Sequence, residues 1–183
     1  QMVQAAVIEN DARTILRDGL AYDRCTVGVV TDMDGFDTLA DFDIQTPEQM
    51  AKVMRTQVDV VLPSGAAVLN AAQPEVADLA RLCDGAVILY ATDPDLPAIT
   101  AHRANDHGRA VLVRGGHVVL ATGSSEKSLG ALDRLGFGRD TPNVHTLLAA
   151  IGAAWALDIA PDLIAAGIKT FEPQVPALGG GRT

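Results

Sequence analysis

Several runs of Ala, Val, Ile and Leu lack polar alternation, which is typical of strands buried on both faces of a sheet. We expect such strands over residues 4–9, 26–30, 58–62, 66–70 and 85–91. Apolar residues at helical spacing predict a short helix or turn over residues 13–22 and helices over 46–57, 74–83 and 93–105. Strands that alternate with helices indicate an α/β fold with a mainly parallel sheet flanked by helices.

Local signals sharpen this prediction at three points. Thr46 is placed to cap the helix over residues 46–57, with Pro47 at its first position and Gln49 completing a capping box. The composition of residues 63–65, Pro-Ser-Gly, predicts a turn between two strands. A Gly-Gly pair at 115–116 joins two apolar runs and predicts a small antiparallel hairpin annex beside the main sheet.

The C-terminal third is expected to be helical. A long helix is predicted to start at Thr141 and Pro142, and a second over residues 162–171 with Leu163 and Ile164 facing inward. Residues 124–140 carry no pattern that assigns them to an element. Two prolines and three consecutive glycines in residues 172–183 are typical of a linker, so we expect one domain over 1–171 followed by a tail.

Composition narrows the classes of partner. The chain has 183 residues, enough for one domain with a sizeable core, and a formal net charge of −9 without a Lys/Arg cluster. Phosphate backbones need concentrated positive charge, so a nucleic-acid surface is not expected. No apolar run is long enough to span a membrane, and a cytoplasmic protein is compatible with the composition. The chain begins at Gln1 and enters an apolar run almost at once, which suggests a piece of a longer protein.

An acidic loop follows the apolar run over residues 26–30 and contains Asp32, Asp34 and Asp37. Ligands of open α/β sheets bind beyond the carboxyl ends of the strands, so this loop is a candidate binding site. Aspartates also form turns through their own side chains, and the spacing alone leaves both readings open.

Four stretches in this order resemble the Mur-ligase-like half of the cyanophycin synthetase family. They are ILRDGLAYDRCTVGVVT (15–31), RTQVDVVLPSGAAVLN (55–70), LCDGAVI (82–88) and AAWAL leading to AAGIKTF (153–171). The resemblance implies the fold of a Mur ligase central domain. It also implies an ATP- and Mg²⁺-dependent ligase that activates an aspartate side-chain carboxylate of an aspartyl backbone as an acyl phosphate and joins it to arginine. Relatives of this kind suggest a homo-oligomer.

The resemblance also implies site residues. Glu9 and Asp37 correspond to magnesium ligands, and Asp32, His145 and Thr146 to positions near the nucleotide. The sequence departs from the family in lacking the Gly-x-x-x-x-Gly-Lys-Ser/Thr loop that cradles phosphates. Met54 stands where the family carries a lysine that helps to hold the metal and phosphates.

These departures leave a second class of function open. The chain could be a non-catalytic module that keeps the fold for assembly, instead of part of a working ligase. A receiver-type regulator with an acidic pocket is disfavoured by the hairpin and the paired C-terminal helices. Three arginines, Arg13, Arg17 and Arg55, could meet a phosphate or a carboxylate substrate, although salt bridges to the many acidic residues are the default expectation.

Overall fold

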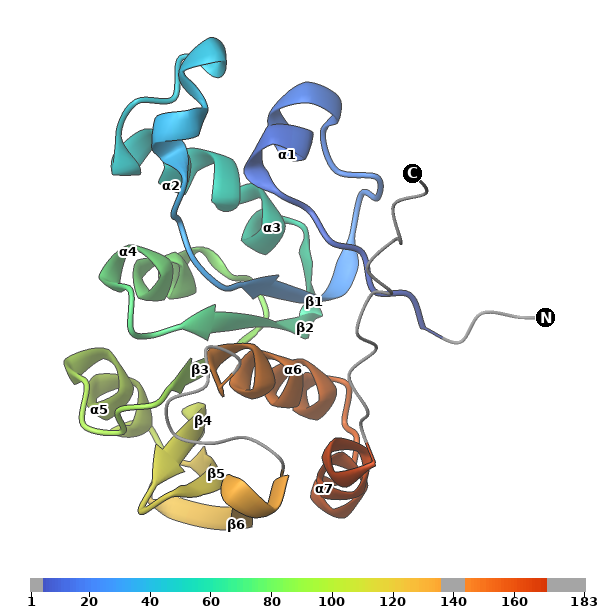
Figure 1. The fold of residues 1–183 in the computed structure, drawn as a ribbon, viewed down its shortest axis with the longest axis vertical. Helices are drawn as coiled ribbons and strands as arrows, with labels where there is room; N and C mark the ends of the chain where they lie inside the picture. Colours follow the sequence, from blue (N-terminus) through green and yellow to red (C-terminus); the bar gives the residue numbers. More distant parts are fainter. Residues whose placement is uncertain (1–4, 136–143, 171–183) are drawn as a thin grey trace, which may run out of the picture.

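The computed structural model describes residues 5–135 and 144–170, which form one sheet between two layers of helices (Figure 1). The sheet has the strand order β1-β2-β3-β4-β5-β6, so each strand lies beside its neighbour in sequence. Strands β1 to β4 run parallel, and β5 and β6 continue the sheet antiparallel. The strands are β1 (Cys25–Val30), β2 (Val61–Asn70), β3 (Ala86–Ala91), β4 (Arg109–Arg114), β5 (His117–Thr122) and β6 (Ser125–Ala131). The predicted α/β class with a mainly parallel sheet is confirmed.

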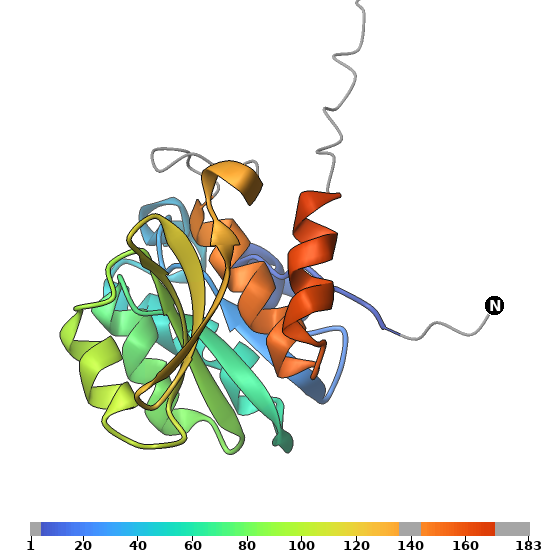
Figure 2. The same cartoon turned by 90° about the horizontal axis from the view of Figure 1, so that it is seen from below.

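Each face of the sheet is covered by its own group of helices. The α-helices are α1 (Ala12–Asp18), α2 (Pro47–Met54), α3 (Thr56–Asp59), α4 (Pro74–Ala77), α5 (Pro97–Arg103), α6 (Val144–Ala156) and α7 (Pro161–Lys169). Short 3-10 turns are η1 (Phe36–Thr38), η2 (Ala40–Phe42), η3 (Asp78–Leu82) and η4 (Asp133–Leu135). One core cluster joins the sheet to α1, α2, α4 and α5, and the other joins it to α6 and α7, with the sheet between them (Figure 2).

The local signals at the helix cap and the hairpin turn are confirmed. The Thr46 hydroxyl accepts a hydrogen bond from the Gln49 amide at 3.3 Å, and Gln49 Oε1 accepts one from the Thr46 amide at 3.1 Å. Gly115 and Gly116 have φ angles of +58° and +81°, the left-handed values that a two-residue hairpin turn requires. The hairpin is not an annex, however, because β4 pairs directly with β3 and the sheet runs through it.

The strand predicted over residues 4–9 is wrong for the part that the structure describes. Residues 5–9 are extended, unpaired and exposed; Val7 is 100% exposed and Ile8 49%. An apolar run becomes a buried strand only when a neighbouring strand pairs with it, and the described residues supply none here. The run over residues 26–30 does form β1, but as the edge of the sheet and only half-buried along most of its length.

The turn predicted at residues 63–65 is wrong as well, because β2 runs through these positions as one strand. The Pro-Ser-Gly sequence instead produces an irregularity in the pairing with β1. Val61 lies opposite Cys25, yet Ala66 lies opposite Val27, so extra residues of β2 bulge at this point. The same turn-forming residues therefore disturb a strand without ending it.

The C-terminal region also differs from the prediction in part. Residues left without an assignment include β6, which has few apolar side chains and is held by its pairing with β5. Ile164 on α7 is buried as expected, but Leu163 is 67% exposed. The predicted helix start at Thr141 and Pro142 and the tail over residues 172–183 lie outside the described residues.

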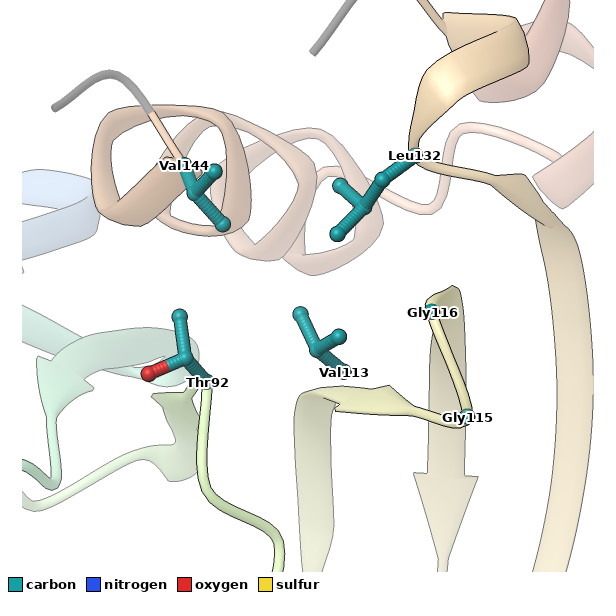
Figure 3. Close-up of a pocket in the computed structure, with 6 residues that line it drawn as sticks. All are labelled: Thr92, Val113, Gly115, Gly116, Leu132 and Val144. Atoms are coloured by element: carbon teal, nitrogen blue, oxygen red, sulfur yellow. The ribbon is translucent and has the colours of Figure 1, made fainter. Parts of the chain in front are cut away.

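Helix α6 lies very close to the sheet. A Cβ atom at Gly152 would lie 2.6 Å from Cγ1 of Val68 on β2, which is too short for any side chain. The helix runs antiparallel to the strands, so its first residue, Val144, lies near Thr92 just after β3 (Figure 3). The start of α6 is therefore fixed at the carboxyl edge of the sheet.

Candidate functional site

The acidic loop follows β1 at the carboxyl edge of the sheet, where the sequence placed it. The Thr31 hydroxyl donates to Asp32 Oδ2 at 2.8 Å, and the amide of Asp34 donates to Asp32 Oδ1 at 3.2 Å. Asp32 is half-buried, so its carboxylate forms a turn while part of the side chain still faces solvent. Both readings of this aspartate from the sequence are thus compatible with its geometry.

Two polar residues that the sequence analysis did not single out hold this edge together. Asn70 is 8% exposed; its side chain donates to the Thr31 carbonyl at 2.8 Å and accepts from the Ala72 amide at 3.0 Å. Gln73 accepts from the Met33 amide at 3.0 Å and donates to Asp34 at 3.3 Å. A polar residue directly after an apolar run is the only signal in the sequence that could have indicated them.

The start of α6 brings His145 and Thr146 to the same edge. His145 is half-buried and Thr146 exposed, both in the first turn of the helix. The first amide groups of a helix have no partner within it, and the helix dipole makes this end electropositive. Groups with hydrogen-bond acceptors are therefore favoured ligands here.

Tyr90, the fifth residue of the six-residue β3, lies below α6. It is completely buried, and Tyr90 Oη and His145 Nδ1 are buried side-chain polar atoms without a hydrogen-bond partner in the described structure. Burial and the negative charge of Asp32 raise the pKa of Tyr90, so its phenol stays protonated and can donate. The sequence analysis missed Tyr90, since a tyrosine within an apolar run looks like any core residue.

A pocket opens between the start of α6 and the ends of β3 and β4 (Figure 3). Its volume is about 260 Å³, and Val144 of α6 and Leu132 face Thr92 and Val113 across it. The backbone of the Gly115–Gly116 turn forms the remaining wall. Apolar walls with one hydroxyl and exposed backbone suit a flat, uncharged group better than a phosphate.

The two expected magnesium ligands, Glu9 and Asp37, lie in different segments of the chain. Glu9 is exposed in the extended segment before α1, whereas Asp37 lies in η1 after the acidic loop. Within residues 5–135 and 144–170, no group of three or more His, Cys, Asp or Glu side chains could hold a metal ion. Mg²⁺ is usually held by one or two carboxylates together with phosphate oxygens and water, so the assignment of Glu9 and Asp37 stays a prediction.

The side chains considered as phosphate contacts in the sequence analysis pack in the core or pair with acidic residues. Met54 is 7% exposed and belongs to the core, so it contributes no charge to the site. Arg13 pairs with Asp41 at 2.6 Å, which keeps the pKa of that carboxyl below its usual value. Arg17 pairs with Asp18 at 2.7 Å and Arg55 with Asp59 at 2.8 Å, as the default expectation had it.

Comparison with solved structures shows which fold the chain has. A ligase from Neisseria meningitides, UDP-N-acetylmuramate:L-alanyl-gamma-D-glutamyl-meso-diaminopimelate ligase, superposes with a TM-score of 0.51 at 17% identity, over 79% of this chain and 40% of the ligase. This similarity shows a Mur-ligase-like fold. No family model matches the chain.

Sequence comparison then identifies the particular relatives. Cyanophycin synthetase from Synechocystis is 38% identical over 172 residues, and the enzyme from Crocosphaera subtropica is 34% identical over 174 residues. These matches cover 92% and 93% of this chain but 20% of each relative, so the chain spans about one fifth of their length. The chain is therefore similar in sequence to one segment of cyanophycin synthetase.

The helices give no indication of a membrane span. Within residues 5–135 and 144–170, none is both long enough and apolar enough to cross a bilayer.

Proposed function

We propose that the chain is part of an ATP-dependent ligase that joins arginine to the side-chain carboxylates of an aspartyl backbone through an acyl phosphate. The sequence similarity to a cyanophycin synthetase segment over more than nine tenths of the chain carries this proposal. The Mur-ligase-like fold agrees with this proposal. We propose further that the complete protein acts in the cytoplasm as a homo-oligomer.

Within this proposal, the described residues suit the nucleoside half of ATP. The carboxylate of Asp32 can accept hydrogen bonds from sugar hydroxyls, and amide groups in the first turn of a helix such as α6 can donate to acceptor atoms. His145 and Thr146 stand at this helix start, and the nearby apolar pocket can take a flat ring.

The features expected for binding the triphosphate and its metal are weaker than those for the nucleoside. The sequence contains no Gly-x-x-x-x-Gly-Lys-Ser/Thr loop, and the described part of the chain holds no group of three or more His, Cys, Asp or Glu side chains that could bind a metal ion. We therefore assign no step of the reaction to magnesium at Glu9 or Asp37. Magnesium in a complete ligase would neutralise the phosphate oxygens during transfer of the phosphoryl group.

A non-catalytic module is the second candidate. The burial of Met54 favours it, because an apolar side chain in the core cannot neutralise phosphate charge. A chain of this kind would keep the fold for assembly and would bind no nucleotide.

Calorimetric titration of the 183-residue chain with ATP, with and without Mg²⁺, separates the two candidates. We expect weak but saturable binding that Asp32→Asn reduces, because a neutral amide accepts less strongly from sugar hydroxyls than a carboxylate does. Asp43→Asn is the matched control: Asp43 is exposed with φ +59°, which asparagine tolerates. If the unaltered chain does not bind the nucleotide, the ligase proposal fails for this chain and the result supports the non-catalytic module.

A further inference from the structure

Within residues 5–135 and 144–170, the hydroxyl group of Tyr90 is buried among apolar side chains and has no hydrogen-bond partner. The side chain is 0% exposed, and its neighbours in the core cluster are apolar residues of β2, β3, β4 and α6. An unpaired buried hydroxyl lowers the stability of the folded state, so a side chain that keeps one calls for an explanation. A phenylalanine would fill the same space without that penalty.

The position of Tyr90 directs this hydroxyl toward the carboxyl edge. Leu89 and Ala91 belong to the core cluster on the opposite face, so Tyr90 points from β3 toward α6. It pairs in register with Asn70, whose side chain holds the end of β1 just before Asp32. Through Asn70, Tyr90 is thus one strand removed from the end of β1, where the acidic loop begins.

The second unpartnered atom lies on the helix above. His145 Nδ1 is buried without a hydrogen bond in the described structure, although the residue as a whole is only half-buried. Nδ1 can therefore donate to or accept from a ligand that reaches the start of α6. The 13-residue helix α6, which packs on β3, thus carries a second unsatisfied polar atom in its first turn.

We propose that the Tyr90 hydroxyl donates a hydrogen bond to an acceptor atom in the nucleoside half of the bound nucleotide, which rests on the proposed function. The protonated phenol offers a single neutral donor, and the surrounding side chains are apolar. A phosphate at this point would bring negative charge close to Asp32, so an uncharged acceptor fits better. Tyr90 is then a ligand-binding residue whose hydroxyl is satisfied only in the complex.

The substitution Tyr90→Phe tests this inference with two readouts. Without ligand, we expect the melting temperature of the chain to rise by about 2–4 °C, since the unpaired hydroxyl is gone. Titration with adenosine, and separately with ATP, should show about tenfold weaker binding than in the unaltered chain. Inorganic phosphate is the comparison ligand, and its binding should not depend on Tyr90.

The control variant is Tyr22→Phe. The Tyr22 hydroxyl accepts a hydrogen bond from Asn10 at 2.9 Å, so this variant should melt lower and bind adenosine unchanged. Equal adenosine binding by Tyr90→Phe and the unaltered chain would overturn the inference and leave the proposed function intact. A lower melting temperature of Tyr90→Phe would also overturn it, because the hydroxyl would then have a structural partner. Failure of the unaltered chain to bind adenosine or ATP would overturn both.

Discussion

The two edge strands of the sheet differ in charge and in ion pairing. The β6 edge carries Glu126 and Lys127, and both are ion-paired: Glu126 with Arg103 at 2.8 Å and Arg114 at 3.2 Å, Lys127 with Asp162 at 3.3 Å. The β1 edge, Cys-Thr-Val-Gly-Val-Val, has no charge and no proline. Charged side chains keep a sheet edge from pairing with another strand, so only the β6 edge is protected.

Among the described residues, the sheet therefore ends in an ion-paired strand on the β6 side, called here the closed side, and in an uncharged strand on the β1 side, called the open side. Parallel sheets are usually buried on both faces and seldom expose an uncharged edge. At Gly28, Gly65 and Gly85, a Cβ atom would clash with backbone atoms of neighbouring segments. The strands on the open side are therefore closely packed. The predictions below test the two sides separately.

The largest effect is expected at Gly28 on the open side. A Cβ atom there would clash with the Gln57 carbonyl oxygen and lie 2.8 Å from Val61, so Gly28→Ala should lower the free energy of unfolding by about 1–3 kcal/mol. Gly167→Ala on α7 is the matched control. Nothing lies within 4 Å of its added Cβ, so it should stabilise the chain by about 0.5–1 kcal/mol. Urea unfolding of both variants measures the contrast, and equal stabilities would show that the spacing at β1 is not critical.

A smaller effect is expected on the closed side. Glu126→Gln removes the charge that pairs with Arg103, whose side chain is 14% exposed, and with Arg114, which is 45% exposed. Because solvent screens the second pair, we expect a loss of about 1–2 kcal/mol in urea unfolding at low salt. Asp162→Asn is the control: that carboxylate is 92% exposed, so its loss should change stability hardly at all. An equal loss in both variants would contradict the role given to Glu126.

The smallest effect on stability is expected from Thr26→Lys on the open edge. Thr26 is exposed, so lysine fits there without changing the core. We expect unchanged urea unfolding but less self-association at high protein concentration, because a charge now blocks pairing along β1. Light scattering over a concentration series measures this. The same scattering from both proteins would mean that the open edge does not drive association.

Features set by neighbouring residues were predictable from the sequence. The capping box at Thr46 and Gln49 and the Gly-Gly hairpin turn depend on chemistry within a few residues, and both are as expected. Residues 5–9 and β6 show the opposite. The first is apolar but unpaired, and the second is polar yet paired with β5, because strand formation depends on the neighbour and not on the run itself.

The candidate site was predictable to a similar extent. The acidic loop after β1 followed from the rule that ligands bind at the carboxyl ends of strands, and the start of α6 followed from the family resemblance. The link between them, through Asn70 and Tyr90, was missed. Whether a buried polar atom has a partner depends on three-dimensional contacts that no pattern in the sequence encodes.

The close approach of Gly152 to Val68 has a consequence for how such sequences can diverge. A side chain at position 152 becomes possible only if position 68 shrinks, because the two share one volume between helix and sheet. Homologues that keep α6 at the same height above the strands should therefore change these two sites together or not at all.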